Sequence, residues 1–438
     1  MRQKAEVFDK LQYLFHITGF NDHQLHCVIY FDNKLEVEVM EKAVKLLIET
    51  IPMLGKVYKD FGDDSYWEEM DQQSKDVPFV ILHSAEELEK FTTSKTDEKK
   101  GPQIKVGLYR GTSDILSIII NHMVCDGAGF KECVYLLSCI YSNLIENPQY
   151  KPEFLLDGNR NFDRITHSIG KREMLKILLS KKSDNNQNNG DEFPLQCSAL
   201  QTPFIITHEI SEENYKKIRE QCTVMDVKVN DVILTAYFRV ISHFLNVHDN
   251  LPNNAKRKLE IPIMIDMRRY LQDKRFLTLT NLSSTTIVRS EIALSESFQM
   301  TLQQIHKEIS EKKAGKLGMN SFLKLKLLFA LDPMLKLSYH NSYDILKKSL
   351  NNPKICMTNI GIVDSEKLRF KNVKVNNAIV CGSIKYHPHF QMSVSTFENK
   401  MTLCVNLYGN KEDKKIIKDF LQEVDFELND FITQGKKE

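Results

Sequence analysis

The stretch from Asp114 to Ile145 decides the predicted fold, and it reads DILSIIINHMVCDGAGFKECVYLLSCIYSNLI. Its first part, Ile115–Ile120, is a short apolar run rich in β-branched residues, which is typical of a strand buried on both faces. Apolar residues then recur at helical spacing and predict a helix with one buried face; they are Phe130, Cys133, Val134, Leu137, Ile140, Tyr141 and Leu144. The stretch therefore predicts a buried strand, a turn and a helix.

The turn between this strand and this helix carries His122, Asp126 and Gly127. In α/β folds, ligands collect at the carboxyl ends of strands, so a histidine at this place is a candidate catalytic base. A purely structural interpretation fits the same residues, with His122 as a core histidine, Asp126 as a helix N-cap and Gly127 as a turn residue. The residues of the turn leave both interpretations open.

Bulk properties place the chain among soluble proteins. Its 438 residues leave room for two domains or one large bilobal unit, and 42% hydrophobic with 27% charged residues is an ordinary globular composition. The net charge of +1 gives no global attraction to nucleic acid or to an anionic membrane. Nine dispersed cysteines without a CxxC pair, a charged N-terminus and the lack of a long apolar run predict a soluble cytoplasmic protein with reduced thiols.

Strands and helices alternate along the rest of the chain, which predicts an α/β or α+β fold of two similar-sized halves. The helical pattern of Val37–Ile51 ends at Pro52, and Ile104–Tyr109 is predicted to form a hairpin with the strand before His122. We expect the polar, lysine-rich segment Thr92–Gly101 to be a solvated loop. Pro262, inside the predicted strand Leu259–Met267, favours an edge or irregular position for that strand.

Other motifs yield little chemistry. The sequence has no GxxxxGK[ST], GxGxxG, GxSxG or HExxH pattern. His387-Pro-His389 lacks an acid or thiol at ligand spacing, so we expect no metal site there. The Leu- and Lys-rich segment Phe322–Leu337 is interpreted as core packing with lysines in solvent, and membrane contact is not expected.

The turn and several later motifs resemble the thioester-dependent acyltransferase superfamily with its HHxxxDG signature, to which chloramphenicol acetyltransferase, alcohol acetyltransferases and nonribosomal-peptide condensation domains belong. His122 matches the second, catalytic histidine of that signature, and Asn121 replaces the first. Weaker similarities are Pro52-x-Leu54 after a helix, Val229-Asn-Asp231, Ile261–Arg268 and Thr358–Gly361. The DFGWG motif of plant BAHD enzymes is absent, which argues against that branch.

The resemblance implies a fold of two chloramphenicol-acetyltransferase-like subdomains, each a mixed sheet flanked by helices, with the active site in a tunnel between them. We place the N-terminal subdomain at 1–170, a flexible crossover around the Asn-rich run at 171–198, and the C-terminal subdomain at 199–438.

The resemblance also implies roles for individual residues. His122 is the general base, and Asp126, with Gly127, sets the geometry of the turn by pairing with an arginine. Arg268 is the expected partner of Asp126, and its neighbour Arg269 is the alternative. Candidate contacts to the oxyanion or the substrate are Ser283, Ser284, Thr358 and Asn359, and the sequence does not choose among them.

The function implied is transfer of an acyl group from a thioester, preferably acyl-CoA, to a small alcohol or amine acceptor. Coenzyme A or phosphopantetheine would be part of a co-substrate, and no tightly bound cofactor or metal is expected. Lys256-Arg257-Lys258 and Lys171-Arg172 are candidate contacts for the 3′-phosphate of coenzyme A. Two alternatives stay open, a condensation-type enzyme that uses an acyl carrier protein and a non-catalytic member that binds a protein partner.

Overall fold

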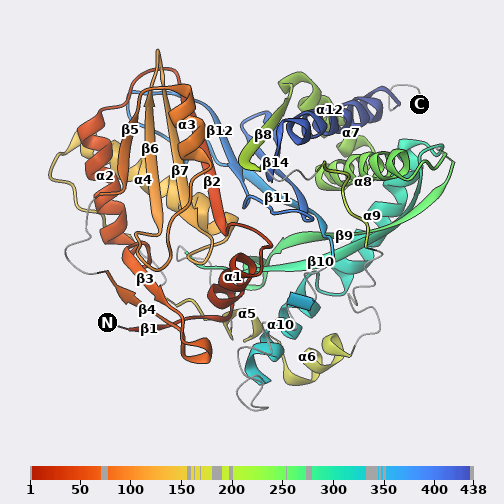
Figure 1. Cartoon of the computed structure of the whole chain (residues 1–438), viewed down its shortest axis with the longest axis horizontal. Coiled ribbons are helices and arrows are strands. Elements are labelled where there is room, and N and C mark those ends of the chain that lie inside the picture. Colours follow the sequence, from red (N-terminus) through yellow and green to blue (C-terminus); the bar gives the residue numbers. More distant parts are fainter. Residues whose placement is uncertain are drawn as a thin grey trace.

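Two mixed β-sheets, each covered by helices, form the body of the protein (Figure 1). The computed structural model describes residues 2–70, 77–154, 159–161, 163–167, 169–179, 190–196, 201–252, 254–272, 279–331, 344, 347–348 and 352–434. The Asn-rich run at 180–189 lies outside the described residues. The predicted fold of two sheet-and-helix subdomains is confirmed.

The first sheet has five strands in the order β12-β2-β7-β6-β5. Their bounds are Val375–Cys381 (β12), Gln24–Phe31 (β2), Asp114–Asn121 (β7), Ile104–Arg110 (β6) and Phe79–Leu82 (β5). The central strand, β7, is antiparallel to both of its neighbours, and all but one of its residues are buried. The predicted buried strand and its hairpin with β6 are therefore confirmed.

Helices cover both faces of this sheet. Helices α4 (Gly127–Glu146) and α2 (Val37–Thr50) share one hydrophobic core with Leu116, Ile118 and Ile120 of β7. Because side chains alternate along a strand, Ser117 faces the other side, where its hydroxyl lies 3.0 Å from that of Thr92 at the end of α3 (Ala85–Thr92). Both faces of β7 are thus covered, as its apolar sequence requires.

The edge strand β12 comes from the last quarter of the chain and pairs with β2 near the N-terminus. The sequence pattern of 375–381 did not predict this strand. A cut at 171–198 would therefore separate β12 from the sheet to which it belongs, and the proposed subdomain boundaries stay a prediction.

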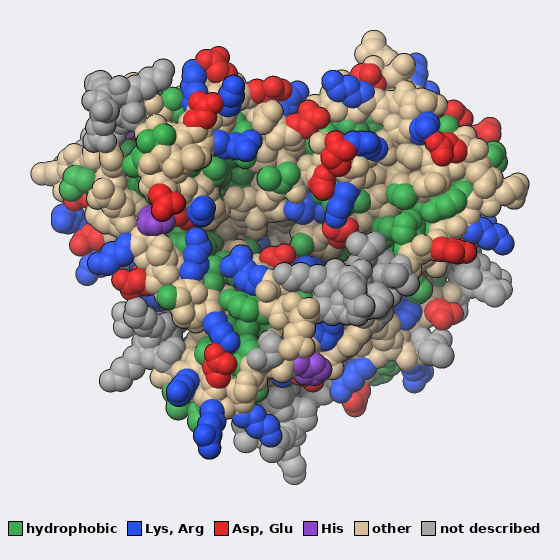
Figure 2. Space-filling model, turned by 180° about the vertical axis from the view of Figure 1, so that it is seen from behind, with side chains coloured by type: hydrophobic (Ala, Val, Ile, Leu, Met, Phe, Trp, Pro, Cys, Tyr) green, Lys and Arg blue, Asp and Glu red, His purple; other side chains and the backbone are tan. Residues whose placement is uncertain are grey.

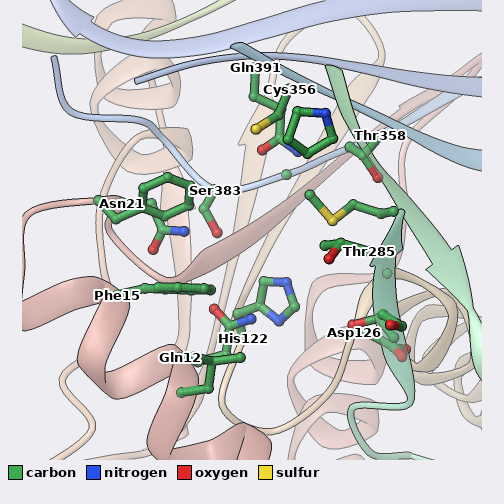
Figure 3. A pocket seen from close by; sticks show the side chains of 18 of the residues that line it. Gln12, Phe15, Asn21, His122, Asp126, Thr285, Cys356, Thr358, Ser383 and Gln391 are labelled. Atoms are coloured by element: carbon green, nitrogen blue, oxygen red, sulfur yellow. The ribbon is translucent and has the colours of Figure 1, made fainter. Parts of the chain in front are cut away.

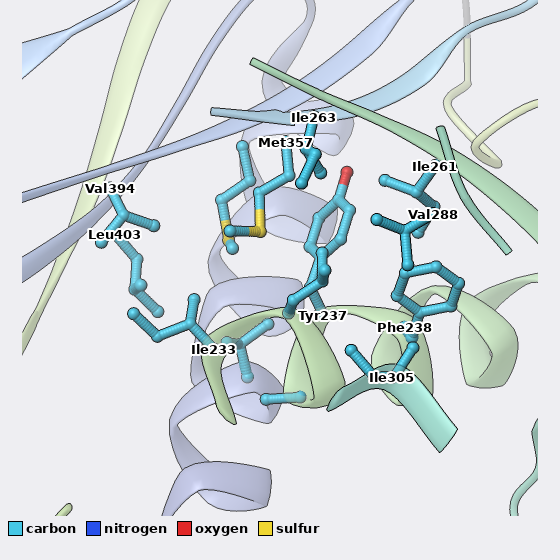
Figure 4. Packing of buried hydrophobic residues seen from close by; sticks show 14 of the residues in the cluster. Ile233, Tyr237, Phe238, Ile261, Ile263, Val288, Ile305, Met357, Val394 and Leu403 are labelled. Carbon is cyan, nitrogen blue, oxygen red and sulfur yellow. The ribbon is translucent and has the colours of Figure 1, made fainter. Parts of the chain in front are cut away.

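The second sheet has six strands in the order β10-β9-β11-β13-β14-β8. Their bounds are Ser283–Ala293 (β10), Lys256–Asp266 (β9), Ile355–Val363 (β11), Phe390–Phe397 (β13), Lys400–Gly409 (β14) and Thr202–Ile210 (β8). The helices packed with it are α7 (Glu212–Val224), α8 (Val229–His248), α9 (Phe298–Ala314) and α12 (Lys411–Gln434). Figure 4 shows Tyr237 and Phe238 of α8 packed against Ile263, Val288 and Met357 of the strands.

Pro262 lies in an interior strand, so the edge position considered for it is wrong. The irregularity is nevertheless present, because β9 pairs with β10 over its whole length but with β11 only at Ile263 and Met357. Pro262 cannot donate to a ladder, and it lines the cavity beside this short contact.

The other elements of the described residues lie around the two sheets. They are β1 (Gln3–Lys4), α1 (Val7–Ile17), a 3₁₀ turn at Pro52–Gly55, β3 (Lys56–Lys59), a 3₁₀ turn at Gly62–Asp64, β4 (Tyr66–Glu69), α5 (Asp163–Thr166), α6 (Lys171–Leu178), a 3₁₀ turn at Met267–Tyr270 and α10 (Met319–Leu331). Strands β1, β4 and β3 form a small third sheet.

Thr92–Gly101 is not a fully solvated loop, because Thr96 and Glu98 are buried and bind Gln24 and His23. In the segment Phe322–Leu337, Phe322 and Leu323 are buried, and the part beyond 331 lies outside the described residues. None of the helices in the described part of the chain is both long and apolar enough to span a membrane.

Candidate active site

A cavity of about 380 Å³ lies between the two halves of the molecule. Helix α1 and the turn after β7 line it from the first half, and β9, β10, β11 and the segment at 382–391 line it from the second. Figure 3 shows His122 inside this cavity, with Gln12 and Phe15 of α1 on one side and Thr285 and Thr358 on another. The cavity wall supplied by α1 was not anticipated from the sequence.

The imidazole of His122 is oriented by Asn281. The Asn281 side chain donates through Nδ2 to the carbonyl oxygens of His122 and Met123, at 2.8 and 3.2 Å, so its Oδ1 faces the ring. Nδ1 of His122 lies 3.1 Å from this oxygen, which can only accept. The contact therefore selects the tautomer with a proton on Nδ1 and leaves Nε2 with a free lone pair.

Burial lowers the pKa of His122 below its ordinary value of 6.5, and Lys385 adds to the decrease, although the backbone and Asp126 oppose it. The imidazole is therefore neutral at neutral pH, which is the form that a general base requires.

Asn281 was not among the site residues predicted from the sequence, which included Ser283 and Ser284 just after it. Asn121, which stands where the family signature has its first histidine, shapes the same turn, since its Oδ1 accepts from the backbone N–H of Met123 at 2.9 Å.

Asp126 closes the turn and starts α4. Its Oδ1 accepts from the N–H of Gly129 at 3.0 Å, which is an N-cap contact, and its Oδ2 accepts from Arg268 Nη1 at 2.8 Å and from the N–H of Leu282 at 2.7 Å. Burial alone would raise the pKa of Asp126, but Arg268 and these N–H groups outweigh burial and lower it. The carboxylate of Asp126 thus serves both as the N-cap of α4 and as the partner of Arg268.

Of the two adjacent arginines, Arg268 is the one that donates to Asp126. It also donates to Asp266 at 3.2 Å and to the carbonyl of Thr280 at 2.8 Å, so it connects the turn to the second sheet. Gly129 has no room for a side chain, because an added Cβ would lie 2.8 Å from Cys125 Cβ and 3.4 Å from Arg268 Nη2. At Gly127 the nearest atom would be Ile360 Cγ2 at 3.5 Å, an ordinary contact.

A second arginine, Arg160, holds the turn from its other side. It is 6% exposed and donates to the carbonyls of Val124 at 2.6 Å, Met123 at 3.0 Å and Leu279 at 3.2 Å. Its Nη2 also lies 2.7 Å from Asp9 Oδ1, and Asp9 is a buried residue of α1. Arg160 lies in a stretch with no clear sequence pattern, which gave no signal for this role.

The four candidate polar contacts separate in the structure. Ser283 and Thr358 line the cavity, as does Thr285, which was not considered. Ser284 also borders the cavity, but it donates its hydroxyl proton to the Gly318 carbonyl at 2.7 Å and so has no proton to offer an oxyanion. Asn359 is exposed and not among the lining residues, because alternate residues of β11 face opposite sides.

The basic runs considered for coenzyme A lie away from this cavity, since none of their residues lines it. Arg257 donates to Asp191 at 2.9 Å and also pairs with Asp249, and Lys256 lies 4.0 Å from Glu296. Arg257 is thus already paired with two carboxylates, and the role of these basic runs in binding the 3′-phosphate stays a prediction. Figure 2 shows acidic and basic side chains mixed over one face of the molecule.

Among the described residues, no group of three or more His, Cys, Asp or Glu side chains could hold a metal ion. His387 pairs with Glu192, and His389 packs its ring 4.5 Å from that of Phe20.

No family model and no curated protein matches the sequence. Solved structures do match along nearly the whole chain. The epimerization domain from the third module of tyrocidine synthetase B is 12% identical, with 99% of this chain and 98% of that chain covered and a TM-score of 0.69. TRI3 trichothecene 15-O-acetyltransferase from Fusarium sporotrichioides is 12% identical, with 98% and 95% covered and a TM-score of 0.68.

The first condensation domain of the CDA synthetase is also 12% identical, with 99% and 96% covered and a TM-score of 0.68. These structures belong to the CoA-dependent acyltransferase and condensation superfamily, and the present chain has their fold.

Proposed function

We propose that the protein is an acyltransferase that moves an acyl group from a thioester to a hydroxyl or amine, with His122 as the general base. The observation that carries this proposal is the imidazole of His122 in the cavity between the two halves, with Nδ1 held by Asn281 and Nε2 left free. The shared fold supports it, because the solved structures with this fold include condensation domains and an acetyltransferase.

In the proposed reaction, Nε2 of His122 takes the proton of the acceptor O–H or N–H as the acceptor attacks the thioester carbonyl. The tetrahedral intermediate carries its negative charge on the former carbonyl oxygen, which needs hydrogen-bond donors. The hydroxyls of Ser283, Thr285 and Thr358 are the candidates from the cavity wall. Collapse of the intermediate breaks the C–S bond, and Nε2–H returns the proton to the leaving thiolate.

Acyl-CoA is the donor that we propose first, and a carrier-bound phosphopantetheine thioester is the second candidate. Both donors present the same thioester to His122, so the site beside His122 does not separate them. Parallel assays with acyl-CoA and with an acyl carrier protein separate the two.

His122→Ala tests the proposal. Loss of a positioned general base lowers the rate roughly 10²–10⁴-fold. The measurement is thiol release from acetyl-CoA, longer acyl-CoAs and an acyl carrier protein, with simple alcohols and amines as acceptors. His248→Ala, at an exposed histidine on α8, is the matched control and should keep full activity.

Since burial lowers the pKa of His122, activity should persist as the pH falls and decline only below about 6.5. Equal turnover by wild type and the folded His122→Ala variant would contradict the mechanism. Absence of turnover in both, together with capture of a protein partner, would instead favour a non-catalytic member of the superfamily.

A further inference from the structure

Two buried lysines line the same cavity as His122. Lys354 is 7% exposed and Lys385 is 4% exposed. Lys354 directly precedes β11 and lies on the same face as Cys356 and Thr358, because alternate residues of a strand share a face. The backbone of Lys385 is fixed by Asn406 O and by the N–H of Tyr408, at 3.0 and 2.9 Å, so both lysines come from rigid parts of the second half.

Neither ammonium group has a carboxylate within 4.0 Å among the residues that the structure describes. Lys385 Nζ instead lies 4.1 Å from the ring centroid of Phe20. The acid whose charge acts on Lys385 is Asp22, whose Oδ1 accepts from the N–H groups of Gln24 and Ile384, while its buried Oδ2 has no hydrogen-bond partner among the described residues. The acid whose charge acts on Lys354 is Glu260, which pairs with Arg289 at 2.8 Å. Burial lowers the pKa of Lys385 to about 8, so the ammonium form still predominates at neutral pH.

Neutral donors accompany the two cations. Ser383 is buried, and its hydroxyl oxygen has no hydrogen-bond partner among the described residues. Gln391 also lines the cavity. Figure 3 shows Ser383 and Gln391 on the side of the cavity away from Gln12, with His122 between. Buried cations and hydroxyls without partners are costly, and such groups in a cavity mark a place built for a ligand of opposite charge.

We propose that Lys354, Lys385 and Ser383 form an anion-binding wall that holds a carboxylate of the acyl acceptor. The proposal rests on the proposed function and names the class of acceptor, a hydroxy or amino acid with its reacting group directed at His122. The phosphates of coenzyme A or of a carrier arm lie at the far end of the pantetheine chain from the thioester, so the anion beside His122 does not come from them. A carboxylated acyl group is the other source, and the experiment separates the two.

The experiment begins with equilibrium binding, which needs no turnover. Calorimetry compares 3-hydroxybutyrate with the uncharged 1,3-butanediol on the wild-type protein, and the hydroxy acid should bind at least about 10-fold more tightly. Lys385→Met should reduce the affinity for 3-hydroxybutyrate about 10- to 100-fold and leave that for butanediol unchanged. Met removes a buried charge at similar length, so the variant should fold. Lys105→Met, at a half-buried lysine of β6 outside the cavity, is the control.

His122→Ala should still bind 3-hydroxybutyrate, which separates this proposal from the proposed function. If transfer occurs but hydroxy acid and diol bind and react equally well, the anion-binding wall is wrong and the acyltransferase is not. A preference for succinyl-CoA over butyryl-CoA with neutral acceptors would assign the wall to the acyl group and overturn the acceptor class. The wild-type comparison decides between these outcomes even if a lysine variant fails to fold.

Discussion

Arg160 and Arg268 hold the His122 turn from opposite sides, and their partners differ in kind. Arg268 binds a side chain of the turn itself, Asp126, whereas Arg160 binds mainly backbone carbonyls of the turn and reaches Asp9 on α1. The contact of Arg268 can be predicted from the sequence, because Asp126 stands at a fixed distance from His122. The contacts of Arg160 with the turn cannot, because every residue has a backbone carbonyl.

The two arginines also differ in burial and in what remains when one contact is removed. The Arg160 side chain is 5% exposed and its acid partner 1%, while the Arg268 side chain is 18% exposed and has a second acid, Asp266, which is half exposed. We therefore expect the contacts of Arg160 to stabilise the turn more than those of Arg268, although the sequence predicted only the contact of Arg268.

Arg160→Met should have the largest effect on stability. It leaves the Asp9 carboxylate buried without its cation and removes a donor from three carbonyls, so the free energy of unfolding should fall by about 3–5 kcal/mol. Urea denaturation followed by circular dichroism measures this, with the exposed Arg219→Met as a control expected to stay within about 0.5 kcal/mol. A loss below about 1 kcal/mol for Arg160→Met would reverse the ranking of the two supports.

Asp126→Asn should cost less, roughly 2–3 kcal/mol, because Arg268 keeps Asp266 and the Thr280 carbonyl. Transfer activity should fall together with stability, since the turn aims His122. The pKa of Asp126 is lowered in the folded protein, so its contribution is complete above the unfolded pKa of about 3.9 and is lost as the pH falls through the folded value.

The difference in stability between wild type and Asp126→Asn should therefore be constant near neutral pH and shrink below about pH 4. Unfolding measured at several pH values checks the shape of this curve. A difference that grows on acidification would show that the carboxylate is not the charged partner of Arg268.

The sequence predicted those parts of the fold that depend on neighbouring residues and missed those that depend on distant segments. The buried strand β7, the hairpin with β6 and helix α4 followed from local patterns, since burial on two faces and a single apolar stripe are written into consecutive residues. Strand β12 was missed because it joins the first sheet from more than 300 residues away in the chain. Local pattern carries no information about which distant segment completes a sheet edge.

In the candidate site, too, the sequence could not show which side-chain atoms are available, because this depends on distant residues. Ser283, Ser284, Thr358 and Asn359 were equivalent as letters, but strand alternation exposes Asn359, and the Gly318 carbonyl engages the Ser284 hydroxyl. Whether a hydroxyl is available depends on an acceptor 34 residues away, which only the folded chain reveals. The orientation of His122 by Asn281 is a contact of the same long-range kind.

The smallest effects on stability are expected at Gly127 and Gly129. Comparing the two shows where the turn is packed closely against Arg268. Gly129→Ala should cost about 1–2 kcal/mol, because its Cβ would meet Cys125 Cβ at 2.8 Å and press on Arg268. Gly127→Ala should change the free energy of unfolding by no more than about 0.5 kcal/mol, since its Cβ meets only Ile360 at an ordinary distance. In addition, alanine has a higher helix propensity than glycine. Thermal unfolding of the two variants side by side is the measurement. If Gly127→Ala were the more damaging change, the tightly packed glycine of the turn would be Gly127 and not Gly129.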